Sequence, residues 1–457
     1  MFSTQTYIER RNTLKRSVGS GLILIMGNEE APMNYHDNTY RYRQDSNFLY
    51  YFGISLPNLA AIIDVDSGEE IIYGDEFSMD DIIWVGPQPT LADQARRVGV
   101  YRTDAYAKLA EKLSKAGKVH FTPPYRYENK FKLNSWLNIP VAQLKERAST
   151  DLIKAIVGQR SYKSAEEIVQ MEEAVNITRE MHLTAMRETR AGRKEFEIAA
   201  LLHQKALEGG GDLAYPIIFS INGQTLHNHY HGNTMTEGKL ALNDSGAENS
   251  MFYAGDITRT IPVSKTFTEQ QKEIYNVVLQ MQLKAIEALK PGVLFRDVHL
   301  LANQVLLEGL DALGIVKGDI NEMLALGVQG LFMPHGLGHA IGLDVHDMED
   351  LGENFVGYRE GLERSTQLGL KSLRLAKELE AGFVVTVEPG LYFIPELIEK
   401  WKAENQFTGF VNYDRLEAYK DFGGVRIEDN CLITDTGYKV LGKPIPKTVE
   451  EVENLKN

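Results

Sequence analysis

Cysteine is almost absent from this chain of 457 residues, and Cys431 is the only one. One thiol cannot form an intramolecular disulfide, so the sequence excludes a disulfide-stapled scaffold and is expected to fold in a reducing compartment. Cys431 precedes Leu432 and Ile433 in an apolar run. This setting favours a buried packing thiol over a nucleophile.

Long apolar runs are also missing. The early run GLILIMG at 21–27 is far too short to cross a bilayer and predicts a buried strand. The first residues, MFSTQTYIERRNTLKR, lack the apolar core of a secretory signal. We therefore expect a cytoplasmic protein that has no membrane partner.

Basic residues are fewer than acidic ones. The chain has 49 Lys and Arg against 63 Asp and Glu, which gives a net charge of −14. This balance disfavours nucleic acid as a partner and suits the binding of cations. Apolar residues make up 43% and charged residues 25%, as is normal for a globular protein. The length favours two domains.

Residues 1–160 predict a smaller α/β domain, in which helices cover a mixed sheet. The turn Asp66–Gly68 separates two of its strands as in a hairpin. No residue of this domain has a catalytic pattern. The expected helices are Thr6–Val18, Asp93–Arg97 and Asp104–Lys115, and the expected strands are Leu22–Met26, Ala60–Val65, Glu70–Tyr73 and Lys118–Thr122.

Residues 161–457 predict a second, α+β domain. Ser164 and Glu167 have the spacing of a capping box, which predicts the start of a helix that reaches about Arg190. Thr268 and Gln271 repeat this pattern before a helix to about Leu289. Further helices are expected at Glu195–Leu207, Arg296–Leu310, Glu322–Leu326, Leu370–Leu379 and Glu396–Lys402, and buried strands at Tyr215–Ser220 and Phe383–Val387.

The stretch LALNDSGAENSMFYAGDITRTIP at 240–262 contains two aspartates in strand-like apolar settings, Asp244 and Asp256. A carboxylate at the end of a buried strand is costly unless positive charge lies against it. The simpler alternative is that both aspartates cap turns through Ser245, Gly246 and Gly255.

Three further metal-ligand side chains follow in apolar, glycine-flanked segments: His339, Glu388 and Glu428. Together the five side chains are mostly hard oxygen donors, which suit a pair of divalent ions such as Mn²⁺, Co²⁺ or Zn²⁺ and not a cysteine-rich zinc site. Two such ions are the equipment of metal-assisted hydrolysis.

Histidines gather around the same motifs. His227, His229 and His231 fall within five residues, and on an extended backbone all three would share a face. His335 and His346 flank His339. A neutral imidazole can donate a hydrogen bond or relay a proton near neutral pH, whereas a lone histidine is more often a hydrogen-bonded core residue.

The motifs GDITRTIPV, HGLGHAIGLDVHD, TVEPGLY and GVRIEDN, in this order, resemble those of the pita-bread metallopeptidases, in the branch of aminopeptidase P and prolidase. The resemblance runs from about Lys163 to the C-terminus. It implies a pita-bread catalytic domain, built from two related α+β halves, at 161–457. RQDSNFLYYFG resembles the N-terminal domain of aminopeptidase P, which helps to close the substrate cleft and to build oligomer contacts; simple core packing is the alternative.

The resemblance also implies roles. Asp244 would ligate one ion, His339 and Glu388 the other, and Asp256 and Glu428 would bridge them. His335 would face the substrate, His229 and His346 would stabilise the tetrahedral intermediate, and Glu388 would carry a proton to the proline nitrogen. Arg426, two residues from Glu428 and on the same face of a strand, would orient a metal carboxylate or bind a substrate carboxylate.

The expected activity is that of an Xaa-Pro aminopeptidase with two divalent ions, Mn²⁺ first, acting on peptides with proline second. The alternative is prolidase, which takes only dipeptides and would need a basic residue such as Arg426 or one near Arg374. A non-catalytic binding protein is a further alternative. The family commonly forms homodimers or homotetramers.

Two relatives fit less well. Methionine aminopeptidase lacks a domain like the first, and creatinase-type relatives lack the metals. One departure is the spacing of 12 between Asp244 and Asp256, one more than expected. We expect the extra residue in the turn near Asn249–Met251, and the alternative is a bulge beside a ligand.

Overall fold

The structure, a computed structural model, describes residues 1–456. The chain forms two compact units. The N-terminal unit contains Met1–Arg160 together with Met348–Phe355, and the second unit contains Ser161–Asp347 and the chain from Val356 onward. The first unit is therefore discontinuous in sequence.

The N-terminal unit is built on a five-stranded mixed sheet with the strand order β4-β3-β2-β1-β5. Its central pairs, β1 with β2 and β2 with β3, are antiparallel, and the two edge pairs are parallel. The strands are β1 (Leu22–Met26), β2 (Ala60–Asp64), β3 (Glu70–Tyr73), β4 (Arg102–Asp104) and β5 (Val119–His120).

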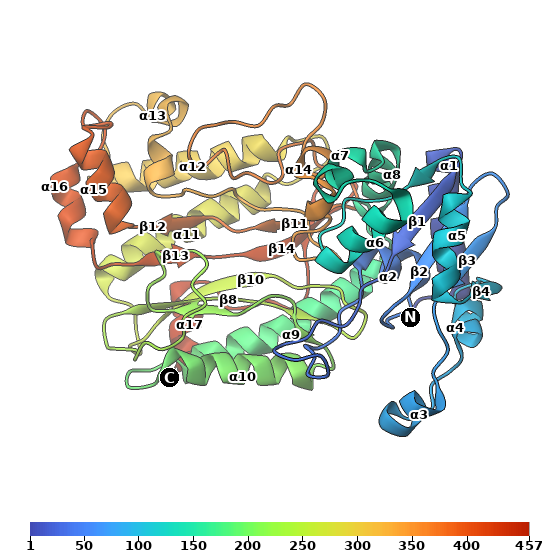
Figure 1. Cartoon of the computed structure of the whole chain (residues 1–457). Helices are drawn as coiled ribbons and strands as arrows, with labels where there is room; N and C mark the ends of the chain where they lie inside the picture. The colour runs from blue at the N-terminus through green and yellow to red at the C-terminus, as the bar shows by residue number, and fades with distance from the viewer. Residues whose placement is uncertain (457) are drawn as a thin grey trace. The chain divides into compact units, whose positions relative to one another are not determined.

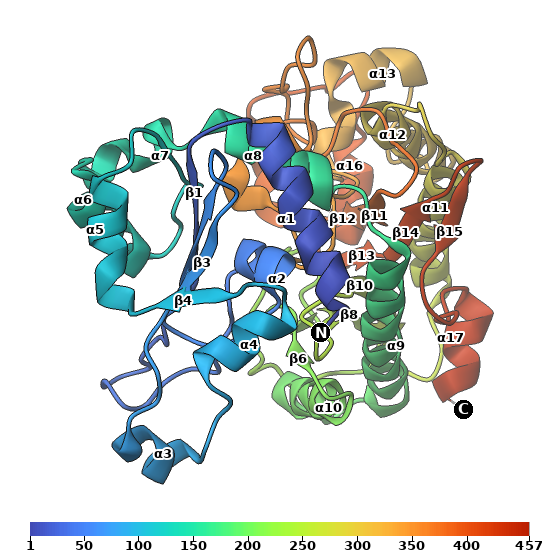
Figure 2. The same cartoon turned by 90° about the vertical axis from the view of Figure 1, so that its right-hand side faces the viewer.

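Helices cover both faces of this sheet (Figure 2). Leu22 and Leu24 of β1 pack with Leu109, Leu133 and Leu144 of three helices. These helices are α5 (Leu109–Ser114), α6 (Tyr127–Leu137) and α7 (Leu144–Arg147), and α1 (Thr4–Val18), α2 (Ser46–Phe52) and α8 (Thr150–Arg160) pack together on the opposite side. The expected helix from Asp104 begins later, because Asp104 still pairs with Tyr73 in the sheet.

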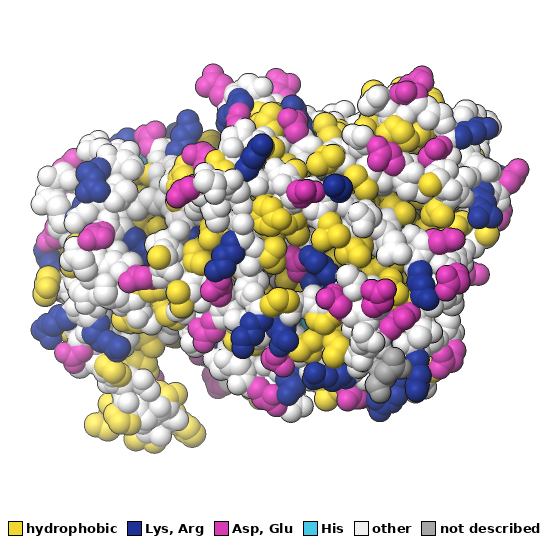
Figure 3. All heavy atoms as spheres, turned by 180° about the vertical axis from the view of Figure 1, so that it is seen from behind, with side chains coloured by type: hydrophobic (Ala, Val, Ile, Leu, Met, Phe, Trp, Pro, Cys, Tyr) yellow, Lys and Arg dark blue, Asp and Glu magenta, His cyan; other side chains and the backbone are white. Residues whose placement is uncertain are grey.

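Helix α3 (Met79–Val85) differs from the others because none of its side chains is buried. Met79 and Ile83 are each 70% exposed, Trp84 is 86% exposed and Val85 is 59% exposed. In Figure 3 this helix is the projecting lobe at the lower left, where hydrophobic side chains lie on the surface. A capping box between Ser78 and Asp81 begins the helix.

The second unit contains two helix-covered groups of strands (Figure 1). In the first, α9 (Ala165–Glu188) and α10 (Glu195–Glu208) pack beside an antiparallel sheet with the order β10-β8-β7. In the second, α11 (Glu269–Glu287) and α12 (Phe295–Ala312) pack together, and α11 also contacts strands of that group. The first group has β7 (Ile218–Ser220), β8 (Leu240–Ser245) and β10 (Ile257–Pro262), and the second has β11 (Val384–Val387), β12 (Gly390–Tyr392), β13 (Gly424–Arg426), β14 (Asp429–Ile433) and β15 (Tyr438–Val440).

Shorter elements complete the chain. No helix in the part that the structure describes is long and apolar enough to cross a membrane. The remaining helices are α4 (Leu91–Arg97), α13 (Ile320–Leu326), α14 (Glu353–Val356), α15 (Pro395–Ala403), α16 (Tyr413–Leu416) and α17 (Val449–Lys456), and the remaining strands are β6 (Asp212–Leu213) and β9 (Ala247–Glu248).

The hairpin that contains both aspartates has one continuous register. Ser245 pairs with Ile257, Gly255 N donates to Ala247 O at 2.9 Å, and Asn249 N donates to Tyr253 O at 3.0 Å. These pairs all belong to the same antiparallel ladder, so no bulge lies beside a ligand. The extra residue is accommodated in the turn between Asn249 and Tyr253, where Phe252 has a φ of +68°.

One expected helix, Leu370–Leu379, is wrong. This segment is irregular, and its amides bond distant backbone: Ala376 N donates to Gly357 O at 2.8 Å and Leu379 N donates to Val293 O at 2.8 Å. Leu373, Leu375 and Leu379 are buried by this arrangement. Long-range pairing has overridden the local helical propensity.

Candidate metal centre

The five predicted ligands come from both groups of strands. Asp244 is in β8 and Asp256 directly precedes β10. Because Asp244 pairs with Thr258, two residues after Asp256, both aspartates lie on the same face of the hairpin. Glu388 directly follows β11, and Glu428 lies between β13 and β14.

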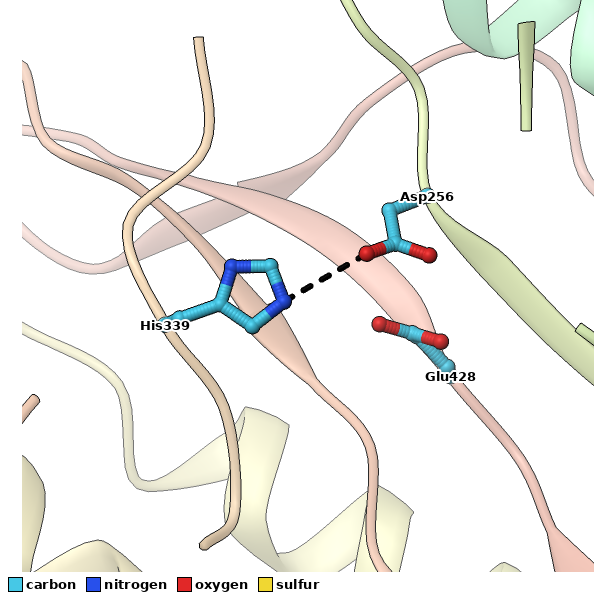
Figure 4. Close-up of side chains that lie close together, drawn as sticks. All are labelled: Asp256, His339 and Glu428. Carbon is cyan, nitrogen blue, oxygen red and sulfur yellow. Dashed lines mark ion pairs between the residues drawn. The ribbon is translucent and has the colours of Figure 1, made fainter. Parts of the chain in front are cut away.

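Three of these side chains converge closely. One ligand atom each from Asp256, His339 and Glu428 lies within 4.8 Å of the others, and all three residues are buried. The three side chains come from separate segments and point toward one another (Figure 4). Nε2 of His339 lies 3.4 Å from Oδ2 of Asp256.

The second ring nitrogen of His339 fixes the tautomer. Nδ1 lies 3.0 Å from the carbonyl oxygen of Ala340, which can only accept, so Nδ1 carries the proton. The lone pair of Nε2 therefore faces the carboxylates, as a metal ligand requires. The backbone N–H of His339 donates to Oγ1 of Thr386 at 3.0 Å and anchors the residue on β11.

The other two predicted ligands adjoin this cluster. Oε1 of Glu388 lies 3.6 Å from Nε2 of His339. The hydroxyl of Tyr215 lies 2.7 Å from Oδ1 of Asp244 and 2.5 Å from Oδ1 of Asp256. One hydroxyl hydrogen cannot serve two ionised carboxylates at once, so this arrangement favours a cation or a shared proton between them.

The donors fit divalent ions. Oε2 of Glu428 accepts from Oγ1 of Thr258 at 2.7 Å, but Oε1 is buried and has no hydrogen-bond partner within residues 1–456. Burial, together with the charges of Asp256 and Glu388, raises the pKa of Glu428 well above its usual value. Burial likewise raises the pKa of Glu388 to about 8. A divalent cation would satisfy the orphaned oxygen and reverse both shifts.

Arg426 supplies a buried positive charge at the edge of the site. Its guanidinium donates to Oδ2 of Asp244 at 2.5 Å, to the hydroxyl of Tyr392 at 2.8 Å and to Oγ1 of Thr258 at 3.2 Å. Burial opposes its charged form, yet Tyr392, Asp244 and Glu388 outweigh burial and raise the pKa of Arg426. Of the two sequence hypotheses, these contacts correspond to the orientation of a metal carboxylate.

Two of the predicted histidines lie at the site. Nδ1 of His335 donates to the Gly336 carbonyl at 2.7 Å, and Nε2 lies 2.9 Å from the Tyr392 hydroxyl. Burial, and then the charge of Arg426, lowers the pKa of His335 to about 3, so this ring is neutral. The ring of His346 packs edge-on against that of His339, with centroids 4.3 Å apart.

The cluster of three histidines differs from the prediction. His227 and His229 are both exposed, and Nε2 of His231 lies 3.0 Å from the Ile217 carbonyl. His227 is the member whose pKa is shifted by the charges of the site. Desolvation lowers this pKa, the charge of Arg426 lowers it further, and the charge of Asp244 raises it. The histidine near the site is therefore His227, and not the predicted His229 two residues later.

Sequence reasoning missed the hydroxyl groups that hold the ligands, which belong to Tyr215, Thr258 and Thr386. Thr258 has a weak signal, because it stands two residues after Asp256 and so shares its face on an extended chain. Tyr215 precedes a strand and belongs to no motif. Only the fold brings its hydroxyl to Asp244 and Asp256.

Two family models match the chain. The model described as metallopeptidase family M24 matches residues 169–435, and the aminopeptidase P N-terminal domain matches residues 7–121. This chain belongs to metallopeptidase family M24. The family prediction from the sequence is confirmed, and the family implies bound divalent metal ions.

Curated relatives of this M24 metallopeptidase carry two descriptions. The Xaa-Pro dipeptidase of Homo sapiens is 31% identical over 455 residues, which cover 94% of this chain and 88% of that protein. A probable Xaa-Pro aminopeptidase of Fusarium vanettenii is 34% identical over 442 residues, which cover 95% of this chain and 92% of that protein.

Solved structures agree over the whole length. Aminopeptidase PepP of Pseudomonas aeruginosa has a TM-score of 0.82 at 26% identity, covering 100% of this chain and 98% of the other. Aminopeptidase P of E. coli in its low-pH form has a TM-score of 0.83 at 29% identity with the same coverage. The predicted fold class is confirmed: an α+β pita-bread catalytic unit together with a smaller α/β N-terminal domain.

Proposed function

We propose that this metallopeptidase is an Xaa-Pro aminopeptidase, which removes the N-terminal residue from peptides with proline in the second position. The observation that carries the proposal is the buried cluster of Asp256, His339 and Glu428, with Asp244 and Glu388 beside it, on a chain that matches aminopeptidase P over its full length. A non-catalytic binding role would not require this donor set.

Asp244, Asp256, His339, Glu388 and Glu428 would hold two divalent ions. Hard oxygen donors with one imidazole and no thiol suit Mn²⁺, with Co²⁺ and Zn²⁺ as alternatives. When bound, such ions supply Lewis acidity and a water nucleophile at neutral pH. Arg426 would keep Asp244 in position through its short contact with Oδ2.

The other side chains would act on the substrate. His346 and His227 would donate hydrogen bonds to the developing oxyanion, and the neutral His335 would face the peptide. Glu388 would carry a proton to the departing proline nitrogen, the role that the motif resemblance implies for this carboxylate. The proline nitrogen has no N–H, so a peptidase that hydrogen-bonds that group would not accept it.

A second candidate is an Xaa-Pro dipeptidase. The charge of Arg374 acts on His227 in the same direction as that of Arg426, so a second guanidinium lies close to the proposed substrate side. A basic group there could bind the free carboxylate of a C-terminal proline. The likeness to the human Xaa-Pro dipeptidase supports the same alternative.

The two candidates are separated by substrate length. We would load the full chain with Mn²⁺ and compare an Xaa-Pro dipeptide with a tripeptide that extends it by one residue. Cleavage of the tripeptide supports the aminopeptidase. Cleavage of the dipeptide alone supports the dipeptidase.

Two controls make this result decisive. The Glu388→Ala variant should remain folded and lose turnover of both substrates, because it removes a metal ligand and the proton carrier together. A tripeptide with alanine in place of proline should not be cleaved. Failure to cleave either proline substrate while metal is bound would refute both candidates.

A further inference from the structure

A buried ion pair lies outside the donor set. Nζ of Lys163 lies 2.9 Å from Oδ2 of Asp347, and the two side chains are only 2% and 1% exposed. Both residues belong to the second unit. A buried pair contributes little net stability compared with apolar residues of similar size, so its presence needs another explanation.

Asp347 closes the loop 340–347, which connects two histidines of the site. Its N–H donates to the Ala340 carbonyl at 2.9 Å, and its Oδ1 accepts from Asp344 N at 3.3 Å. The loop therefore returns to the residue next to His339. This return brings His346, directly before Asp347, against the ring of His339 at 4.3 Å.

Lys163 is itself fixed from the other side. Its backbone N–H donates to the Gly382 carbonyl at 2.8 Å, and the next residue, Ser164, begins α9. Its side chain packs on the bare backbone of Gly342, where a Cβ would lie 2.7 Å from Oδ2 of Asp347 and 3.0 Å from Cε of Lys163. Glycine at 342 thus leaves room for the ion pair.

The pair stands where the chain passes from one unit to the other. The second unit begins at Ser161, two residues before Lys163, and Met348–Phe355, directly after Asp347, belongs to the N-terminal unit. His346 is therefore two residues from the point at which the chain changes unit. If Asp347 were not held in place, any displacement of the segment after Asp347 would be transmitted directly to His346.

We infer that Lys163 is a positioning residue, which holds the loop 340–347 through Asp347 so that His346 stays against His339. The effect on turnover rests on the proposed function, whereas the position of the ring does not. Lys163 acts through Asp347 and contributes no ligand or proton to the reaction.

The first test uses the imidazole of His346 as its own reporter. In full-length protein with ¹⁵N-labelled histidine, the His346 signal is assigned by its loss in His346→Ala. Lys163→Met should shift or broaden this signal in the metal-free protein, and Lys163→Arg, which retains the charge, should leave it near its original position. An unchanged His346 signal in Lys163→Met would overturn the inference, whatever the activity.

The second test is kinetic. With the Xaa-Pro substrate that the wild type cleaves, Lys163→Met should lower kcat about 10- to 100-fold, the range for residues that orient catalytic groups, and change KM less. In a His346→Ala background the same substitution should change kcat less than about twofold, because residues that act as a unit are not additive. A full additional loss in that background would contradict the inference.

Two further variants separate position from stability. Lys163→Met combined with Asp347→Leu removes the pair without leaving a buried charge, so the melting temperature should recover while kcat stays low. Recovery of kcat together with melting temperature would mean that the pair is only structural. Arg11→Met breaks a buried pair with Glu70 in the N-terminal unit and should leave kcat unchanged. An inactive wild type would refute the proposed function, and the His346 signal would still decide the inference.

Discussion

The charges of the site can be counted residue by residue. Asp244, Asp256, Glu388 and Glu428 bring four negative charges when ionised, and Arg426 returns one positive charge. One divalent ion would leave a net charge of −1, and two would leave +1, which a single bound anion balances. Because uncompensated charge is costly in a buried site, this balance favours two ions together with an anion.

The limits of sequence prediction are clear at this scale. The five ligands stand in motifs, and Asp256, His339 and Glu428 do converge in the structure. The sequence analysis chose His229 on the motif resemblance, and the residues themselves did not separate it from His227, because residues two apart share a face on an extended chain. Both side chains are exposed, and only the path of the loop brings His227 within electrostatic reach of Arg426.

His299 predicts a pH dependence. It is buried in α12, where Nε2 accepts from Nδ2 of Asn303 at 2.9 Å, and burial lowers its pKa to about 4. The unfolded chain binds a proton near pH 6.5, so between pH 6.5 and 4 it holds more protons than the folded chain. The free energy of unfolding therefore falls as pH falls. His299→Gln should remove about 2 kcal/mol of the loss between pH 7 and pH 5.

Urea unfolding at both pH values measures this difference. His36→Gln is the control: His36 is exposed and Asp37 raises its pKa, so its contribution has the opposite sign and its removal should not lessen the loss at acid pH. An undiminished loss in His299→Gln would mean that folding does not lower the pKa of the buried ring.

Among the secondary-structure elements, the sequence correctly predicted those helices whose first turn is set by local hydrogen bonds. The capping boxes at Ser164 and Thr268 do begin α9 and α11. The aromatic segment before Gly53 was given no element, yet it forms α2, with Asp45 accepting from the N–H groups of Asn47 and Phe48. Its side chains are all buried, so no polar face marked it as a helix.

The strand that follows Glu428 depends on a second buried network. Nη2 of Arg259 in β10 pairs with Oδ1 of Asp429 at 2.7 Å, and Nη1 donates to the Glu428 carbonyl at 2.6 Å. Nε of Arg259 also donates to the Pro446 carbonyl at 2.9 Å, and Lys447 reaches Asp429 at 2.8 Å. The guanidinium of Arg259 thus connects β10 with β14 and with the segment before α17.

We expect Arg259→Met to lower the free energy of unfolding by about 3–5 kcal/mol, because it leaves Asp429 buried with one partner fewer. Unfolding of the metal-free protein with guanidinium chloride measures the change in this free energy. Arg179→Met is the matched control, since Arg179 donates to the Pro444 carbonyl at 3.0 Å in the same segment but lies partly in solvent. An equal loss in both variants would mean that the contact with the segment, and not the buried pair, carries the effect.

The whole molecule has two units, each with a core of its own, and only the second contains the donor set. Ligands that bind only the folded state stabilise it, by about 2.7 kcal/mol at a free concentration one hundred times Kd. Chelation of the metal should therefore lower the melting temperature of the second unit and leave that of the first unchanged.

Differential scanning calorimetry with and without EDTA tests this expectation. Manganese added back in excess should restore the transition, and Asp256→Asn should make it insensitive to both treatments. A parallel shift of both transitions would mean that the two units unfold as one cooperative body.

The discontinuity of the N-terminal unit has a consequence for how the protein is made. A ribosome delivers the chain from its N-terminus, and domains usually fold in that order as they emerge. Here the first unit also includes Met348–Phe355, so its last piece is synthesised after two of the four motifs and before the two that contain Glu388 and Glu428. The N-terminal unit therefore remains incomplete until residue 355 has been translated. The folding of the two units is thereby linked in time.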